Sequence, residues 1–152
     1  MSQEKISQED LVPLALLRAM GGNLQGKTRL QKLAFLLDEE KLGDRLDAYH
    51  FRKYDYGPFS KGLLEDIEDL EDKGLVDIHR SRTLGGNTRY DYEITDVGET
   101  IVSDIFSRGD ASIILEDAED IAVEYGDLPL RELIELVYEK FPEYKENSVY
   151  QY

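Results

Sequence analysis

The sequence of 152 residues contains no cysteine, which excludes disulfide bonds and thiolate metal sites. It also lacks any apolar run that approaches the length of a membrane-spanning helix. The first residues, Met1 to Lys5, lack the apolar core of a signal peptide. We therefore expect a cytoplasmic protein that has no contact with a membrane. A chain of this length can bury a core of its own, as one domain or as one domain with a helical extension.

Positive charge is scarce as well. Lysine and arginine together number 18 against 33 aspartate and glutamate residues, so the formal net charge is −15. This balance argues against a general nucleic-acid coat or a membrane-surface protein. Two explanations of the acidity stay open. The carboxylates either keep the surface soluble, or they adapt the protein to the molar salt of a halophile, where screening removes their mutual repulsion.

The most informative stretch is residues 70–98. After Gly74 the sequence alternates between apolar and polar residues over 75–79, and it alternates again over 89–95. Between these two strands, Gly85 and Gly86 supply the positive φ of a tight hairpin. Thr95 can cap the helix that follows. A helix that leads into a two-stranded ribbon and then into another helix is typical of a winged-helix domain, a fold that usually binds partners and rarely catalyses.

Helical spacing of apolar residues surrounds this ribbon. Before it, the spacing predicts helices over 11–20, 30–37 and 60–73, with Ser60 as the N-cap of the third, a strand over 49–54 and a turn over 57–60. After it, the spacing predicts helices over 97–106, 114–125 and 130–141. We therefore predict an α+β fold: a mostly helical, winged-helix-like domain over 1–108 with a small antiparallel β-ribbon as the wing. A C-terminal helical hairpin over 109–152 would pack on the same core.

Several segments resemble a known family. Residues 26–37 (GKTRLQKLAFLL) and 54–60 (YDYGPFS) are similar to conserved segments of the Panacea-domain (SocA-like) antitoxin group and of YwgA-like proteins. Residues 70–76 and 141–148 resemble the same proteins. The resemblance implies a non-enzymatic regulatory module, and it implies for some members an antitoxin role through contact with a partner protein. It supplies no binding residue that can be transferred to this chain.

A phosphate-binding motif also occurs. Residues 21–28 match the P-loop pattern GxxxxGK[ST], in which Lys27 would contact phosphate and Thr28 would contact magnesium. A P-loop follows a β-strand, whereas residues 11–20 have helical spacing. His50 and His79, the only histidines, lack a second ligand at a known metal spacing. We therefore expect no enzyme activity, no cofactor and no metal site.

The helix over 60–73 lies where a winged-helix protein places its recognition helix, but it is strongly acidic. Its carboxylates would face the phosphates of DNA, and only one helix separates the predicted strand over 49–54 from the ribbon, so the helix-turn-helix is expected to be incomplete. Contact with a protein is the alternative, and aromatic residues at the C-terminus are typical of interfaces. The candidate protein-contact residues are Glu65, Glu68, Asp69, Asp72, Tyr144, Tyr150 and Tyr152.

Basic residues gather on the predicted ribbon. They could contact phosphates or the minor groove of DNA, or they could form cross-strand pairs with Asp77, Asp91 and Glu93. We favour the pairing. The candidate nucleic-acid contacts are Lys61, His79, Arg80, Arg82 and Arg89, and a second basic group comprises Lys27, Arg29, Lys32, Arg52 and Lys53.

Two hypotheses of function follow. The first is a non-enzymatic regulatory module of the antitoxin type that binds a basic, toxin-like protein through the acidic helix or the C-terminal helices. The second is a winged-helix transcription regulator that binds DNA through its basic wing. Both allow a homodimer through the C-terminal helices. We favour the first, because the acidic helix argues against DNA and the family resemblance implies protein contact.

Overall fold

The computed structural model describes residues 10–42, 52–54, 57–107 and 109–145. The helices are α1 (Leu11–Ala19), α2 (Lys27–Leu37), the π-helix η1 (Asp38–Leu42), α3 (Lys61–Asp72), α4 (Asp96–Ile105), α5 (Gly109–Tyr125), α6 (Leu130–Lys140) and the 3-10 helix η3 (Pro142–Lys145). The strands are β1 (Asn23–Gln25), β2 (Arg52–Tyr54), β3 (Gly57–Phe59), β4 (Val76–Arg82) and β5 (Thr88–Ile94).

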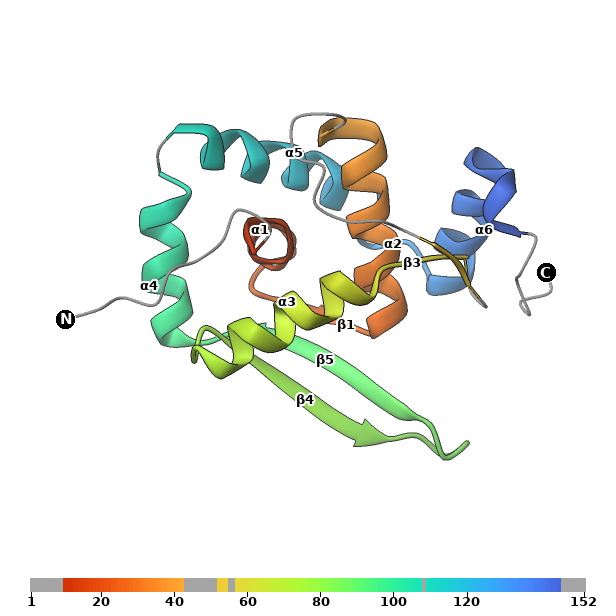
Figure 1. Ribbon diagram of the computed structural model, residues 1–152, viewed down its shortest axis with the longest axis horizontal. Helices are drawn as coiled ribbons and strands as arrows, with labels where there is room; N and C mark the ends of the chain where they lie inside the picture. The colour runs from red at the N-terminus through yellow and green to blue at the C-terminus, as the bar shows by residue number, and fades with distance from the viewer. Residues whose placement is uncertain (1–9, 43–51, 55–56, 108, 146–152) are drawn as a thin grey trace.

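The fold is α+β, as predicted, with a small antiparallel sheet in the order β1-β5-β4 and a separate β2–β3 pair. The sheet extends away from the helices as a long β4–β5 ribbon, and α3 lies along it (Figure 1). Within the described ranges, no helix combines the length and the apolar character that a membrane span requires.

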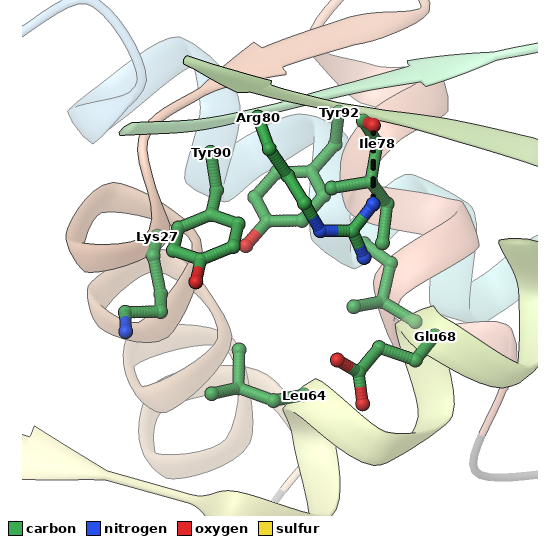
Figure 2. A pocket seen from close by; sticks show the side chains of 8 residues that line it. Lys27, Leu64, Glu68, Ile78, Arg80, Tyr90 and Tyr92 are labelled. Atoms are coloured by element: carbon green, nitrogen blue, oxygen red, sulfur yellow. Dashed lines mark hydrogen bonds between the residues drawn. The ribbon is translucent and has the colours of Figure 1, made fainter. Parts of the chain in front are cut away.

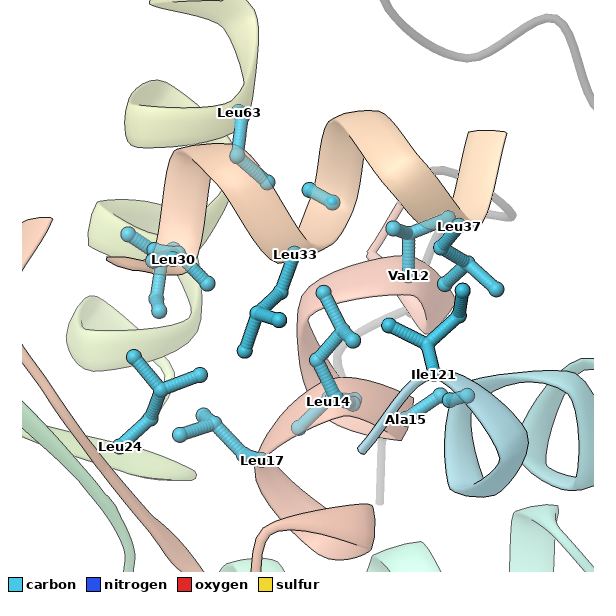
Figure 3. Close-up of a cluster of buried hydrophobic side chains, with 14 of the residues drawn as sticks. Val12, Leu14, Ala15, Leu17, Leu24, Leu30, Leu33, Leu37, Leu63 and Ile121 are labelled. Carbon is cyan, nitrogen blue, oxygen red and sulfur yellow. The ribbon is translucent and has the colours of Figure 1, made fainter. Parts of the chain in front are cut away.

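The core is built around α1. Its sequence, LVPLALLRA, is apolar on almost every side, and a helix of that kind belongs in the interior. Figure 1 shows α1 end-on at the centre, between α2, α4, α5 and the sheet. In Figure 3, Leu14 and Leu17 from α1 lie among Leu33 from α2, Leu24 from β1 and Ile121 from α5. One apolar cluster therefore joins the N-terminal helices to α5.

The structure confirms the predicted β-ribbon, which β4 and β5 form as an antiparallel pair. Gly86 has a φ of +85° in the turn between β4 and β5. Gly85 does not have a positive φ, so the prediction that both glycines supply it is wrong for Gly85. Thr95 caps α4, because its hydroxyl accepts a hydrogen bond from the amide of Gly98 at 2.9 Å. The same hydroxyl donates to the carbonyl of Gly74 at 2.7 Å, so the cap of α4 also holds the end of the turn after α3.

The first strand of the sheet differs from the prediction. β1 lies at Asn23–Gln25 and pairs with β5, between Gly22 and Gly26, which have φ values of +99° and +96°. Both α2 and α3 therefore lie between β1 and the ribbon. From the predicted strand, described as β2, only α3 leads to the ribbon, as expected. A strand of three residues is too short to show alternation, so its sequence resembles a helix-ending turn.

The same stretch bears on the P-loop pattern. Residues 21–28 follow helix α1 and contain an antiparallel strand, whereas a P-loop is one glycine-rich loop between a strand and a helix. The predicted strand over 49–54 is described only at β2, which pairs with β3. The turn predicted over 57–60 is wrong for Gly57–Phe59, which form β3, and right for Ser60, whose hydroxyl caps α3.

The C-terminal helices pack on the same core, but not as the predicted hairpin. α5 packs against α1 and α2, and α6 packs against α2 and β3, so each helix has other elements as its main neighbours. Lys140 in α6 donates hydrogen bonds to Glu40 in η1 and to the hydroxyl of Tyr125 in α5, each at 2.8 Å. Tyr125 in turn donates to Glu40 at 2.7 Å. The division at residue 108 into two domains stays a prediction.

Two buried polar residues of α2 fix the start of α3. Gln31 accepts a hydrogen bond from the amide of Ser60 at 2.8 Å and donates to the carbonyl of Ser60 at 2.9 Å. Lys32 donates to the carbonyl of Pro58 at 3.3 Å. The two segments that carry most of the family resemblance, 26–37 and 54–60, therefore contact each other, and the contact sets where α3 begins.

Replacing Gln31 should loosen this corner. We expect Gln31→Ala to lower the free energy of unfolding by about 2 kcal/mol, because the buried amide and carbonyl of Ser60 lose their partner. The matched control is Gln25→Ala, which removes an exposed amide from β1 and should change stability by less than about 0.5 kcal/mol. Urea unfolding of both variants measures the difference, and equal stability of the two would contradict this role for Gln31.

Candidate functional site

A groove lies between α3 and the face of the ribbon that is turned toward it (Figure 2). It is open to solvent and encloses a small volume of about 70 Å³. Its lining residues are Lys27 from α2, Leu64, Ile67 and Glu68 from α3, Ile78 and Arg80 from β4, and Tyr90 and Tyr92 from β5. The groove therefore combines an apolar and aromatic floor with charged groups of both signs at its edge.

Strand register explains why these side chains meet. Ile78 lies opposite Tyr92 and Arg80 lies opposite Tyr90, so all four point to the same face of the ribbon. On α3, Leu64 and Glu68 are one turn apart and share a face. Along β4 the burial falls from Val76, which is fully buried, to Arg80, which is exposed. The ribbon therefore diverges from α3 toward the turn between β4 and β5, and the groove opens at that end.

Arg80 connects the two walls of the groove. Its guanidinium donates to both oxygens of Glu71 in α3, at 3.0 and 3.1 Å. These hydrogen bonds lower the pKa of Glu71 and raise the pKa of Arg80. Both side chains are partly exposed, so the pair contributes orientation more than stability. Its effect is to neutralise the arginine that stands closest to α3.

The remaining charges of the groove are less constrained. The amine of Lys27 lies 5.0 Å from the ring centre of Tyr90, a cation–π contact. Burial raises the pKa of Tyr92, which therefore stays neutral on the floor. Glu68 is exposed and has no hydrogen bond or ion pair with any part of the chain that the structure describes. A carboxylate without a partner thus stands beside an aromatic surface.

The acidic candidates on α3 form one exposed surface, which we call the α3 acidic face and define as Glu65, Glu68, Asp69 and Asp72. Asp69 pairs with Lys73 at 2.8 Å, and this hydrogen bond raises the pKa of Lys73. Glu65 and Asp72 have no charged partner among the described residues, and Glu68 forms no ion pair there but interacts electrostatically with Arg80. The sequence located this face correctly on the exterior, because the apolar stripe of Leu63, Ile67 and Leu70 turns it outward.

The basic candidates of the ribbon are not one patch. Arg80 and Arg82 lie on the face toward α3, whereas His79 and Arg89 lie on the opposite face, as the register of β4 with β5 requires. His79 contacts Glu93 at 3.2 Å, a cross-strand pair of the predicted kind. Arg89 contacts Asp91 at 3.0 Å, but both residues lie on β5, so this pair is not cross-strand as predicted. His79 and Glu93 also lie near Asp77, and together these three have the donor atoms for a metal ion.

The other basic residues are dispersed. Arg82 and Lys61 are exposed and have no charged partner among the residues with described positions. Arg29 donates to the carbonyls of Gly126 and Leu128, so it supports the turn between α5 and α6. Lys32 is buried, and the side chains of Arg52 and Lys53 lie outside the described residues. No second basic surface forms from the described members of this group.

The aromatic candidates at the C-terminus have different positions. Tyr144 is half-buried, and its ring packs edge-on against Phe35 with 4.9 Å between ring centres. Burial also raises its pKa, so Tyr144 helps to hold η3 on the core and is a poor contact residue. Tyr150 and Tyr152 lie outside the described residues. The predicted dimer through the C-terminal helices stays a prediction, with Val123 and Leu130 as exposed apolar residues there.

No family model matches the sequence, and no curated protein matches it. The resemblance to the Panacea-domain and YwgA-like proteins therefore stays an expectation from sequence segments. The groove and the α3 acidic face are the features of this chain that bear on its function.

Proposed function

We propose that this chain is a non-enzymatic regulatory module of winged-helix-like fold, which binds a basic protein through the α3 acidic face and the adjoining groove. The order of elements supports the fold assignment. Two helices, α2 and α3, separate β1 from the ribbon, and the antiparallel order β1-β5-β4 places the β4–β5 hairpin as a wing. The β2–β3 pair is then an insertion between α2 and α3, and α3 occupies the place of a recognition helix.

The observation that carries the proposal is the charge of α3. Its exposed side presents Glu65, Glu68 and Asp72, which form no ion pair with the described residues, and Glu71 neutralises the nearest ribbon arginine. Such a surface repels the phosphates that dominate the affinity of proteins for DNA. The same surface attracts lysine and arginine side chains of a protein, and complementary charge speeds association.

The groove supplies an anchor for such a partner. An arginine or lysine side chain could lay its apolar stem on Leu64 and Tyr92 and place its charge near Glu68. Contacts of this kind, with an aromatic surface and a carboxylate, recur among the residues that dominate binding energy at protein interfaces. The family resemblance adds one point to this proposal: the regulation is of the antitoxin type, and the basic partner is a toxin-like protein.

The charge of α3 can be removed without disturbing its packing. We expect the triple variant Glu65→Gln, Glu68→Gln and Asp72→Asn to weaken partner binding by at least about tenfold, because it removes the complementary charge of the interface. The matched control is Glu116→Gln, Glu119→Gln and Glu124→Gln, which removes the same charge from the exposed side of α5. Quantitative affinity capture from a native lysate, followed by cross-linking, measures the effect.

The supporting result is specific. The captured protein must be basic, must cross-link to α3 and must be lost from the α3 variant but not from the α5 control. A partner that binds both variants equally, or an acidic partner, would refute the proposal.

DNA binding remains the second candidate, because Arg82 and Lys61 are exposed and unpaired among the described residues. Under this alternative, DNA is captured in place of a protein. Mobility shifts at two salt concentrations would then show a smaller salt dependence for the double variant Arg82→Ala and Lys61→Ala.

A further inference from the structure

The face of the ribbon turned away from α3 carries a group of possible metal ligands. The donor atoms of Asp77, His79 and Glu93 all lie within 4.8 Å of one another, and all three side chains are exposed. Nε2 of His79 lies 3.2 Å from Oε1 of Glu93. This face is separate from the groove, so an inference about it does not depend on the proposed function.

Strand pairing creates the group. Asp77 in β4 lies directly opposite Glu93 in β5, an arrangement in which two carboxylates repel each other. His79 follows two residues later on the same face of β4 and leans diagonally toward Glu93. The residue opposite His79 is Asp91, which Arg89 already engages. Among the described residues, no lysine or arginine pairs with Asp77 or Glu93. The repulsion therefore lacks a counter-charge from any lysine or arginine that the structure describes.

We propose that these three side chains bind a divalent transition-metal ion of the Zn²⁺ type. One imidazole nitrogen and two carboxylate oxygens are donors that Zn²⁺ accepts, with water in the remaining position. Ca²⁺ and Mg²⁺ prefer ligand sets made only of oxygen, so the imidazole selects against them. The bound cation replaces the repulsion between Asp77 and Glu93 with coordination to both. The net charge of −15 also raises the local concentration of cations.

The pattern was hidden in the sequence because the ligands have no motif spacing. Asp77 and His79 are two residues apart on one strand, and Glu93 comes from the other strand. Only the register set by the turn around Gly86 brings the three together. The expectation of no metal site considered spacing along the chain and did not consider pairs across the ribbon.

Isothermal titration calorimetry with ZnCl₂, on the full chain without a histidine tag, tests the site. We expect a single Zn²⁺ per chain, and we expect His79→Ala to weaken binding by at least about tenfold, because it removes the nitrogen ligand. This variant removes no carboxylate, so the general attraction of cations to an acidic protein is preserved. His50→Ala is the control for the other histidine, and Asp77→Asn against Asp110→Asn separates coordination from loss of one charge.

The proposal requires that His79→Ala and Asp77→Asn each lose affinity while His50→Ala and Asp110→Asn keep it. Co²⁺ as a second probe should give visible absorption bands in the wild type that are absent in His79→Ala. Equal Zn²⁺ affinity of the wild type and His79→Ala would overturn the proposal, as would equal losses in Asp77→Asn and Asp110→Asn. Asp77, His79 and Asp110 are exposed, and circular dichroism verifies that each variant is folded.

Discussion

Lys32→Met is expected to stabilise the protein at neutral pH and to remove part of its dependence on pH. Lys32 is only 2% exposed, and burial lowers its pKa to about 7. Among the described residues, its amine has one hydrogen bond, to the carbonyl of Pro58. In the unfolded chain the pKa of a lysine is about 10.4. Between these values the unfolded state binds more protons, so the wild type gains stability as the pH rises.

The difference between the pKa of Lys32 in the folded and unfolded states sets the size of this effect. It changes the free energy of unfolding by about 4 kcal/mol between pH 7 and pH 10.4. Below pH 7 both states are protonated, and the full destabilisation is present. We therefore expect Lys32→Met to be more stable than the wild type by about 3 kcal/mol at pH 7, after allowing about 1 kcal/mol for the hydrogen bond that the Pro58 carbonyl loses. The advantage should disappear near pH 10.4.

Urea unfolding at pH 6, 8 and 10 measures the difference in unfolding free energy between the variant and the wild type. The effects of the overall acidic charge are common to both proteins and cancel in this difference. Lys61→Met is the matched control, because Lys61 is exposed at the start of α3 and undergoes the same chemical change. Its difference from the wild type should stay within about 0.5 kcal/mol at every pH. A Lys32→Met protein that is less stable than the wild type at all pH values would show that the amine is charged and well stabilised in the fold.

The sequence could predict those features that depend on a pattern within one continuous segment of the chain. The ribbon has seven residues in each strand and a glycine in its turn, so alternation and turn chemistry are both visible. The cap of α3 at Ser60 and the outward acids of that helix follow from one helical stripe. The central place of α1 agrees with its almost continuous apolar sequence. In each case the information lies within about a dozen consecutive residues.

The features that sequence could not predict depend on pairs of distant residues. β1 is a strand only because the backbone of β5 is beside it. The groove exists because the ribbon register aligns Tyr90 and Tyr92 with Leu64 on a helix more than twenty residues away. Lys32 is buried beside Pro58, to whose carbonyl it donates a hydrogen bond. Its sequence position did not indicate this, because a lysine in a helix is ordinarily exposed to solvent. The pairing of Arg80 with Glu71, rather than with a strand neighbour, has the same origin.

Gly98→Ala is expected to lower the free energy of unfolding by about 3 kcal/mol. Gly98 lies in the first turn of α4, where a Cβ atom would come within 2.2 Å of the carbonyl oxygen of Leu75 and 2.8 Å of the side chain of Ile94. That oxygen also accepts a hydrogen bond from the amide of Thr95, so it is not free to move away. The clash costs about 1–3 kcal/mol, and displacement of the Gly98 amide from the hydroxyl of Thr95 costs about 1 kcal/mol more.

The direction of this prediction opposes the intrinsic preference of the helix. In an exposed helix, replacing glycine by alanine would stabilise by about 1 kcal/mol, so a measured loss can only come from the close approach of α4 to the turn before β4. Gly85→Ala is the control, because Gly85 lies in the exposed turn of the ribbon and its nearest neighbour would be 3.9 Å away. Thermal and urea unfolding of both variants decide the question. A Gly98→Ala protein as stable as the wild type would mean that α4 does not sit against Leu75 in solution. In that case the base of the wing, and with it the groove beside α3, would not be held as described.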